Sequence, residues 1–520
     1  MTFPYCKNGL GQASTVISDI SARSVSTVPA TVPDASPDIE AAAAAFAATF
    51  RRDQLITDPA GLRTYECDGL SAFRVRPALV LLADSTEDVV AAVRICTTYG
   101  VCFVPRGAGT GLSGGALPQA NGVVISTARM RKVLSIDPDN RRMTVQPGMA
   151  NSAVSAAAES HGLYFAPDPS SQIVCSVGGN VAENSGGAHC LKYGFTTNHI
   201  HAITVVTPTG EVVRLGGSSA DPVGPDLLGV FIGSEGTLGI VTEITVRLLV
   251  RPIAVRTLVA DFATAEQAAD AVSGLVSHGV IPAAVEMLDQ LAISAVETAT
   301  RAGYNRDAGA ALVIELDGFD AAVGEEFTIT ERLCRDNHAS NIRIAQSPAE
   351  RDLIWKGRKS AFAAMGRISP AYLVQDGVIP RTKLAEVLTR IAELATAAGL
   401  RVANVFHAGD GNLHPLVLFD SDDAEETERA EQLSTAIAEL CVTFGGSLSG
   451  EHGIGADKAC SMPTMFSGDD LETMQRVRAA FDPAGLANPD KIFPTPRLCG
   501  ERSGKYRPHP LELTGRIGRG

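Results

Sequence analysis

The sequence predicts an α+β chain of two large units, the second containing an antiparallel sheet backed by helices. With 520 residues, the chain exceeds what one hydrophobic core usually supports. Up to residue 252, short apolar strands are separated by polar, glycine-rich stretches, whereas from residue 253 strands alternate with longer helical patterns. Pro252 marks the boundary, because proline ends strands. We expect a disordered leader over residues 1–35, units over 36–252 and 253–495, and a basic tail over 496–520.

Local signals place the elements of the first unit. A helix is expected to begin at Ser36-Pro37, because serine caps helices and proline suits the first helical position. Ser85 is expected to cap a second helix, and a third is expected over 151–160 with Gly162 just beyond its end. Apolar runs predict strands over 78–83, 101–104, 123–126, 143–146, 203–207, 211–215 and, as one long strand, 238–250.

The second unit shows both helical and strand periodicity. Its clearest helical patterns cover residues 384–398 and 424–444. Apolar runs predict strands over 257–259, 311–316, 372–375, 402–406 and 416–419. Strands mixed with helices in this way predict an antiparallel sheet with helices packed on it.

Composition excludes several classes of protein. The net charge of −14 disfavours a nucleic-acid partner. No apolar run reaches the roughly 18 residues of a membrane span, and the first 35 residues lack a signal-peptide pattern, with a transit peptide as the alternative to a disordered leader. The ten cysteines are scattered without a CxxC pair, which excludes iron–sulfur and structural zinc sites and indicates reduced thiols in the cytoplasm.

A glycine-rich loop follows the strand expected at 101–104. Its Gly109-x-Gly111-x-x-Gly114 formally matches the dinucleotide-binding fingerprint. The next strand begins near Val123, which leaves no room for the crossover helix of that motif. Successive backbone N–H groups in such a loop can instead surround an anion, as a pyrophosphate requires.

Two further stretches repeat this composition. PDPSSQ is followed by GGNVAENSGG, and GSEGTLGIVTE leads directly into a strand. A single loop of this kind is as often an ordinary tight connection. Three of them within about 130 residues favour a large phosphate-bearing cofactor.

The second unit contains candidate metal ligands. In FHAGDGNLHPLVLF, His407 and His414 flank a turn signal between two apolar segments, so the hairpin brings both imidazoles together. Glu451 and His452 follow in SGEHGIG. Any one of these histidines, taken singly, is more often a structural residue. Two histidines and a carboxylate in glycine-rich turns nevertheless fit a catalytic divalent ion: Zn²⁺, Mn²⁺ or Fe²⁺.

These motifs together resemble a known family. PRGAGTGLSGGALP, PDPSSQ with GGNVAENSGGAHCLKYG, and GSEGTLGIVTEIT are similar to the FAD domain of vanillyl-alcohol-oxidase-type flavoproteins. The resemblance runs from Leu55 to Phe493 and is strongest to the FAD-binding subunit of glycolate oxidase and to D-lactate and D-2-hydroxyglutarate dehydrogenases. It implies an FAD-binding domain of two subdomains, of the p-cresol methylhydroxylase (PCMH) type, and an α+β cap domain with an antiparallel sheet.

The resemblance also implies the cofactor and its residues. FAD is expected to be non-covalent, because Ala108 and Thr110 occupy the loop where some relatives carry a linking histidine. The implied FAD-binding residues are Arg106, Gly107, Gly109, Thr110, Gly111, Pro167, Asp168, Ser171, Gly178, Gly179, Asn184, Gly187, Glu235, Gly239, Ile240 and Asn488. Asn488 lies in GLANPDKIF, where Asp490 replaces the family's usual glycine, so a positive φ at this position is an open question.

The resemblance assigns His407, His414 and Glu451 as metal ligands, with Zn²⁺ as the first expectation, and His452 as the active-site base. Arg358 matches the family's carboxylate-binding arginine, and Arg381 is a second catalytic candidate. D-2-hydroxyglutarate dehydrogenases carry a lysine just before the aspartate that corresponds to Asp376. Val374 and Gln375 stand here instead, so glycolate or D-lactate fits better than a dicarboxylate.

The expected activity is therefore FAD-dependent oxidation of a small 2-hydroxy acid by hydride transfer to flavin N5, with metal-assisted deprotonation by His452. One alternative is a flavoprotein subunit that needs an iron–sulfur partner or a quinone to accept its electrons. The other is a non-redox enzyme related to ether-lipid synthases. We expect a cytoplasmic protein whose membrane association, if any, comes through a partner.

Overall fold

The computed structural model describes residues 37–218 and 224–495. The expected leader and basic tail, and the expected cap Ser36, lie outside these residues. The first helix, α1 (Ile39–Thr49), is capped by Asp38, whose side chain accepts a hydrogen bond from the Ala41 amide. Helix α3 (Thr86–Thr98) has the predicted cap, because the Ser85 hydroxyl accepts from the Asp88 amide.

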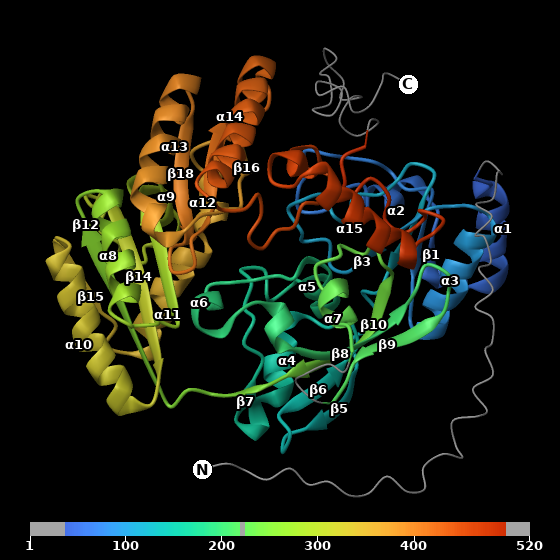
Figure 1. Cartoon of the computed structure of the whole chain (residues 1–520), viewed down its shortest axis with the longest axis horizontal. Helices are drawn as coiled ribbons and strands as arrows, with labels where there is room; N and C mark the ends of the chain where they lie inside the picture. The colour runs from blue at the N-terminus through green and yellow to red at the C-terminus, as the bar shows by residue number, and fades with distance from the viewer. Residues whose placement is uncertain (1–36, 219–223, 496–520) are drawn as a thin grey trace, which may run out of the picture. The chain divides into compact units, whose positions relative to one another are not determined.

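The first sheet has four strands in the order β1-β2-β4-β3. Strands β1 and β3 and the neighbouring helices α1 and α3 are labelled in Figure 1. Strands β2 (Leu79–Leu82) and β3 (Phe103–Arg106) both run parallel to β4 (Val123–Ser126), and β1 (Leu55–Ile56) is antiparallel to β2. Helices α1 and α3 pack on this sheet through a core that includes Phe46, Val93 and Phe103. As predicted, no helix interrupts the glycine-rich connection from β3 to β4.

The second sheet is antiparallel, in the order β5-β6-β10-β8-β9. Its strands are β5 (Val133–Asp137), β6 (Arg142–Val145), β8 (Ile200–Val206), β9 (Val212–Gly216) and β10 (Ile240–Arg247). The short helices of this region are α2 (Pro59–Arg63), α4 (Asn151–Ala158), α5 (Val177–Glu183), α6 (Cys190–Tyr193) and α7 (Leu227–Phe231).

The prediction of one strand over 238–250 is wrong. Strand β10 ends at Arg247, and a separate strand, β11 (Leu249–Val250), pairs with β7 (Leu163–Tyr164) in a different sheet. The chain changes partners at Leu248, whose amide donates to the carbonyl of Arg141 instead of to a strand of the second sheet. The sequence pattern does not reveal this change, because apolar residues continue through Leu248 and Leu249 across the break between the two strands.

A nine-stranded sheet forms the second half of the molecule. Its strands are β12 (Ala254–Phe262), β13 (Ala284–Asp289), β14 (Ala310–Gly318), β15 (Asn341–Ile344), β16 (Ala371–Val374), β17 (Gly377–Val378), β18 (Arg401–His407), β19 (Asn412–Leu413) and β20 (Pro415–Phe419). The pair of β12 and β14 is antiparallel over its full length, from Ala254 opposite Gly318 to Phe262 opposite Ala310.

Helices cover both faces of this sheet, as its side-chain alternation requires. In β12, Leu258 and Ala260 belong to the core beneath α8 (Ala265–Ser277), α10 (Asp320–Asp336), α13 (Leu384–Ala398) and α14 (Ala424–Thr443). Val259 faces the opposite core, formed with α9 (Gln290–Thr300), α11 (Pro348–Lys359) and α12 (Ala361–Met365). Two buried faces explain why strands here read as continuous apolar runs.

The end of the described chain returns to the first sheet. After α15 (Gly468–Phe481), Ala487 forms a parallel bridge with Phe103 of β3, and the Asn488 amide donates to the Phe103 carbonyl. Residues far apart in the sequence thus share one wall, which lies beside the glycine-rich loop.

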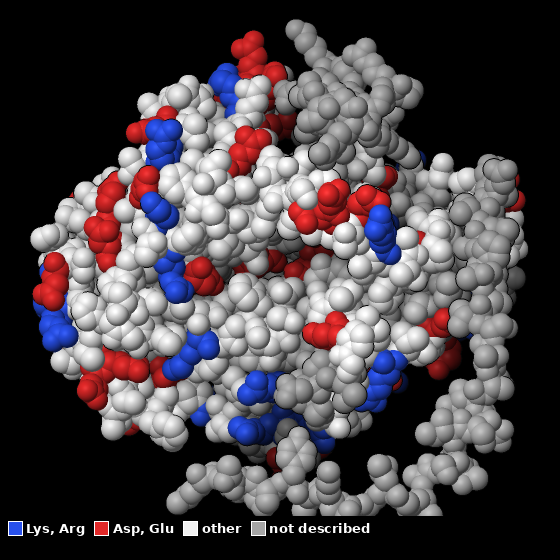
Figure 2. Space-filling model, viewed as in Figure 1, with Lys and Arg blue, Asp and Glu red and all other residues white. Residues whose placement is uncertain are grey.

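The described surface carries charged side chains of both signs (Figure 2). Figure 2 shows Lys and Arg side chains interspersed with Asp and Glu over the described part of this face. Among the described residues, no helix is long and apolar enough to span a bilayer.

One cysteine corrects the expectation that all cysteines are reduced, because Cys460 is in a disulfide. The free thiols include Cys67, Cys96, Cys175, Cys190, Cys334 and Cys441.

Candidate functional site

The three glycine-rich stretches meet at one cavity of about 430 Å³, which we call the glycine-lined cavity. Eleven of the predicted FAD-binding residues line it: Arg106, Gly107, Gly109, Thr110, Gly111, Ser171, Gly178, Gly179, Glu235, Gly239 and Ile240. A Cβ added at Gly111 would meet nothing closer than 3.8 Å, so it would project into the cavity itself. This open backbone suits a large cofactor that lies directly against peptide groups.

Arg106 holds the first loop in shape. Its guanidinium donates to the Ala116 carbonyl at 3.5 Å and lies 5.3 Å from the ring centre of Tyr65. Gly109 has φ of 71°, and a Cβ there would overlap the Arg106 guanidinium. The loop therefore needs glycine at this position for both conformation and space.

Five other predicted FAD-binding residues do not line the cavity: Pro167, Asp168, Asn184, Gly187 and Asn488. The Pro167 carbonyl accepts from Asn151, and the Asn184 side chain accepts from the Thr197 amide. Gly187 packs against Asp168, which pairs with His189. These contacts stabilise the loops that form the cavity wall, on the side that faces away from the cavity.

Asn488 joins three segments of the cavity wall. Its side-chain amide donates to the carbonyls of Gly115, at 2.8 Å, and Glu235, at 2.6 Å. The turn after it does take positive φ at Asp490, at 59°, so the aspartate adopts the conformation for which glycine is usual. The C-terminal segment thus stabilises the cavity wall through the side-chain hydrogen bonds of Asn488.

Glu235 links the cavity to the loop after His452. Its carboxylate accepts from the amides of Ile454 and Gly455, each at 2.7 Å. Burial raises the pKa of Glu235 to about 7, although the two amides act in the opposite direction. Burial and the neighbouring Glu235 raise the pKa of Glu183, which also lines the cavity, well above its ordinary value.

The structure brings the predicted metal ligands together. Strand β18 ends at His407 and is followed by the predicted tight turn, so His414 returns beside it, with the two rings 5.1 Å apart. The Oε1 atom of Glu451 lies 3.3 Å from Nε2 of His407 and 3.3 Å from Nε2 of His414. These three ligand atoms lie within 4.8 Å of one another. We call these residues, together with His452, the histidine cluster.

Asp376 holds the loop that carries Glu451 and His452. Its buried carboxylate accepts from the amides of Gly450, at 3.1 Å, and His452, at 2.8 Å, and from the Ser449 hydroxyl, at 2.6 Å. The His414 and His452 rings stack 5.0 Å apart, and Asp376, His414 and His452 form a second possible metal-binding group. Burial acts to raise the pKa of Asp376, but His452, Lys458 and His414 together lower it well below its ordinary value.

Glu286, in the middle of β13, orients His407. Its carboxylate accepts a hydrogen bond from Nδ1 of His407, 2.7 Å away, so Nε2 points toward Glu451. Burial acts to lower the pKa of His407, but Glu286 and Glu451 outweigh it and raise the pKa well above its ordinary value. The ring therefore lies in a strongly negative environment that a cation would balance.

The cluster fits a divalent cation on two further observations. Both ring nitrogens of the buried His414 lack a hydrogen bond, although Nε2 lies 3.4 Å from Asp376 as well as close to Glu451. Arg358 pairs with Glu286, and Lys458 lies 3.4 Å from Asp376, whereas the groups closest to the Glu451 carboxylate are the candidate ligands His407 and His414 themselves. An imidazole nitrogen without a hydrogen bond, facing a carboxylate, is a suitable donor set for a metal.

The two predicted substrate-binding arginines lie outside the glycine-lined cavity. Arg358 is only 4% exposed, and its guanidinium lies 2.6 Å from Glu286, behind His407. Arg381 donates to the carbonyl of Gly409 at 3.3 Å, where it supports the turn between the two histidine ligands. In this structure both guanidiniums contact protein groups.

Sequence reasoning missed several residues of the site. Glu286 contacts the histidine cluster, Lys458 lies 3.4 Å from Asp376, and Glu183, Lys359 and Phe362 line the glycine-lined cavity. A glutamate inside an otherwise apolar strand is a signal that could have identified Glu286, because an unpaired charge is rarely buried. Lys359 carried no such signal, because exposed lysines are common.

Comparison with known proteins agrees with the architecture. Residues 77–216 match the family described as FAD binding domain, and residues 251–492 match FAD linked oxidases, C-terminal domain. Solved structures of similar fold include 4-ethylphenol oxidase from Gulosibacter chungangensis (TM-score 0.73, 19% identity, covering 89% of this chain and 99% of that one) and p-cresol methylhydroxylase (0.74, 17%, 87% and 96%). These likenesses confirm the predicted PCMH-type fold.

Relatives found by sequence are more similar to this chain than these solved structures are. Glycolate oxidase subunit GlcD of Escherichia coli (strain K12) is 51% identical over 86% of this chain and 89% of its own length. The GlcD subunit of Bacillus subtilis (strain 168) is 37% identical (84% and 93% covered), and a D-lactate dehydrogenase of Anaerostipes hadrus is 34% identical (81% and 90%). With such relatives over most of its length and both domains matched, the chain belongs to the FAD-linked oxidoreductases that include glycolate oxidase subunits and D-lactate dehydrogenases.

Proposed function

We propose that the protein oxidises a small 2-hydroxy acid, glycolate or D-lactate, to the 2-oxo acid with FAD and a divalent metal. One observation carries the proposal: Glu451 and His452 line the glycine-lined cavity, and Glu451 is also part of the predicted metal triad. The redox cofactor and the cation would therefore meet at one wall. The names of the relatives, glycolate oxidase subunit and D-lactate dehydrogenase, support this class of substrate.

When bound, FAD supplies a hydride acceptor at N5, and a divalent cation, Zn²⁺ or alternatively Mn²⁺ or Fe²⁺, supplies a Lewis acid for the hydroxyl group. The residues of this chain would position the FAD and the cation. Nε2 of His407, Nε2 of His414 and Oε1 of Glu451 would hold the cation, with Glu286 fixing the tautomer of His407.

His452 is the proposed base. Burial lowers its pKa to about 4, with Asp376 partly opposing this, so the ring is neutral at pH 7 and can accept a proton. Nε2 lies on the Glu451 side, 3.8 Å from its carboxylate, and would take the hydroxyl proton. Asp376 lies 4.0 Å from Nδ1, where it would stabilise the imidazolium.

The electrons must then leave through another group. Among the described residues, the possible metal-binding groups contain no cysteine, so this part of the chain offers no iron–sulfur site. We propose transfer to an iron–sulfur partner subunit or to a quinone. Such a partner would also provide any membrane association of a cytoplasmic chain.

The direct test uses the purified full chain reconstituted with FAD and kept free of oxygen. Glycolate or D-lactate should bleach the flavin absorbance, and a chelator should prevent bleaching without releasing FAD. A dye-reduction assay would distinguish this activity from that of the ether-lipid-synthase type, which transfers no electrons to a dye. A flavin that no 2-hydroxy acid bleaches, with metal present, would refute the proposal.

Variants assign the base. His452→Ala should slow flavin reduction by at least about 100-fold while leaving the flavin content unchanged. His161→Ala is the matched control, because His161 is exposed and lies outside the cavity. Normal reduction in the His452 variant would remove this residue from the mechanism.

A further inference from the structure

Two glutamates approach each other at the wall of the glycine-lined cavity. Glu183 is the last residue of α5, and Glu235 lies in the third glycine-rich stretch, just before β10. A Cβ added at Gly453 would overlap both Oε2 of Glu183 and Oε1 of Glu235, so the two carboxyl groups converge on one point. We call these two glutamates the carboxyl pair.

The two members of the carboxyl pair differ in their hydrogen bonds. Glu235 accepts from the amides of Ile454 and Gly455, each at 2.7 Å. Within residues 37–218 and 224–495, the buried Oε2 of Glu183 has no hydrogen-bond partner, nor does Oγ of the fully buried Ser113. Buried polar atoms normally have partners, so these atoms indicate a place for a proton or for a group of the cofactor.

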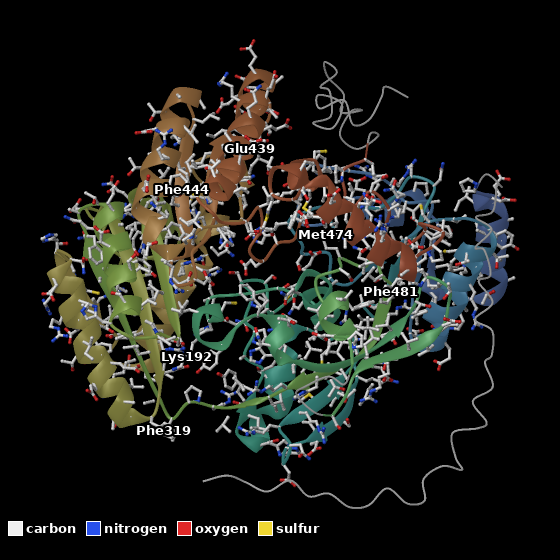
Figure 3. The ribbon with its side chains drawn as sticks, viewed as in Figure 1. Lys192, Phe319, Glu439, Phe444, Met474 and Phe481 are labelled. Carbon is white, nitrogen blue, oxygen red and sulfur yellow. The ribbon has the colours of Figure 1, made fainter. Side chains whose placement is uncertain are left out.

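Helix α5 holds Glu183 in position. Val177 and Val181 of this helix are fully buried in the core of the second sheet, and Phe481 of α15, labelled in Figure 3, packs against the same core. Asn184 ends the helix in the left-handed conformation, with φ of 53°. The packed helix therefore keeps the carboxyl group of Glu183 beside the cofactor.

The carboxyl group of Glu183 faces the loop that is expected to surround the pyrophosphate. Its Oε1 atom lies 2.6 Å from the place of a Cβ added at Gly115, and 3.8 Å from one at Gly111, which would project into the cavity. FAD carries negative charge on its phosphate groups. An ionised Glu183 would repel that charge where little water screens it, whereas a protonated Glu183 could donate a hydrogen bond.

The charged groups that face the carboxyl pair include more acids than cations once the pair is counted. The acids are Asp68, Asp376 and Asp490, and the cations are Arg106, Lys458 and Lys491. The neighbouring His452, whose pKa burial lowers to about 4, adds no charge at neutral pH. Burial and Glu235 raise the pKa of Glu183 well above its ordinary value. The carboxyl pair should therefore lose its last proton well above the usual pH range of a carboxyl group.

We propose that Glu183 binds FAD in its protonated form, as a hydrogen-bond donor, so that above neutral pH the carboxyl pair takes up one proton from solvent as FAD binds. Bound FAD would displace water from the cavity and add negative charge, and both changes favour the neutral form of Glu183. The inference goes beyond the proposed oxidation, because it concerns FAD binding, whichever 2-hydroxy acid is the substrate.

The test measures the Kd of FAD for the full chain, freed of flavin, by quenching of flavin fluorescence from about pH 6 to about pH 9. Glu183→Gln is compared with the unmodified protein, because glutamine keeps the donor and cannot ionise. Glu211→Gln is the matched control, because Glu211 is exposed and lies outside the cavity. Calorimetry in two buffers of different ionisation enthalpy counts the protons taken up.

The Kd of the unmodified protein should rise about three- to tenfold for each pH unit above neutrality, because up to one proton is taken up per FAD. Glu183→Gln should show a Kd that changes little with pH, and at about pH 9 it should bind FAD at least about tenfold more tightly than the unmodified protein. A purely structural role of Glu183 predicts only a loss of affinity. Glu211→Gln should resemble the unmodified protein.

A Kd of the unmodified protein that does not change with pH, or the same pH dependence in Glu183→Gln, would overturn the inference. The calorimetric count needs no variant, so zero proton uptake above neutral pH would overturn it even if Glu183→Gln did not fold. PH-dependent FAD binding in a protein that no 2-hydroxy acid reduces would support the inference and refute the proposed function.

Discussion

His189 should make the stability of the protein depend on pH in a defined window. The ring lies between two carboxylates, with Nδ1 3.0 Å from Asp168 and Nε2 3.3 Å from Glu315, and it stacks on Trp355. Asp168 belongs to the FAD-binding region and Glu315 to strand β14 of the nine-stranded sheet. His189→Gln removes the charge and keeps a polar side chain of similar reach.

The magnitude follows from the pKa of His189, about 10 in the folded protein against 6.5 for an ordinary histidine. The full difference corresponds to at most about 5 kcal/mol. We expect roughly 2 kcal/mol, since Asp168 and Glu315 keep Lys359 and Arg351 as neighbouring cations when His189 is neutral.

The direction of the pH effect on stability depends on whether the folded or the unfolded chain binds the proton of His189. Below pH 6.5 both folded and unfolded chains are protonated at this position, and the stabilisation is complete. Between 6.5 and 10 only the folded chain keeps the proton, so the stabilisation is lost as the pH rises through this window.

The assay is urea unfolding of the FAD-loaded protein and of His189→Gln, followed by circular dichroism from about pH 6 to about pH 9.5. The difference between their free energies of unfolding should shrink as the pH rises. His278→Gln, at an exposed position, is the control for loss of a histidine. A difference that stays constant across the window would refute the reasoning.

Three further outcomes are expected. Glu286→Gln should weaken metal binding by about 10- to 100-fold, measured by metal content after dialysis, because His407 loses the carboxylate that orients it. Gly111→Val should raise the Kd for FAD, measured by flavin fluorescence, because the new side chain would enter the glycine-lined cavity. Phe406→Ala, at a fully buried position of β18, should cost about 3–5 kcal/mol in urea unfolding, and a change below about 1 kcal/mol would contradict its place in the core.

Local signals in the sequence were sufficient for many elements. The helix predicted over 384–398 is α13, with the same bounds, because its apolar residues repeat at helical spacing and Gly399 ends it in the left-handed conformation. Strand β4, at 123–126, is likewise where its apolar run predicts it. Such elements need no knowledge of the partner on which they pack.

Long-range pairing could not be read in the same way. The division of residues 238–250 into β10 and β11 depends on which strands lie alongside, and Tyr164, the partner of Leu249, is 85 residues away in the chain. The anchoring of Asn488 on Gly115 and Glu235 is similarly non-local. Periodicity describes one segment at a time and holds no information about these contacts.

The site shows the same limit. His407, His414 and Glu451 were identified because each stands in a glycine-rich turn that resembles a family motif. The resemblance could not show that the guanidinium of Arg358 lies against Glu286, because that contact depends on the direction of one side chain from α11. The neighbouring Lys359 differs from it only by one step around the helix.

The bridge between Ala487 and Phe103 sets an order of events during synthesis. Strand β3 leaves the ribosome early, but the segment that completes its edge is among the last to be made. Cofactor capture should therefore wait until translation is nearly finished, and nascent chains that stop before Ala487 should emerge without bound flavin.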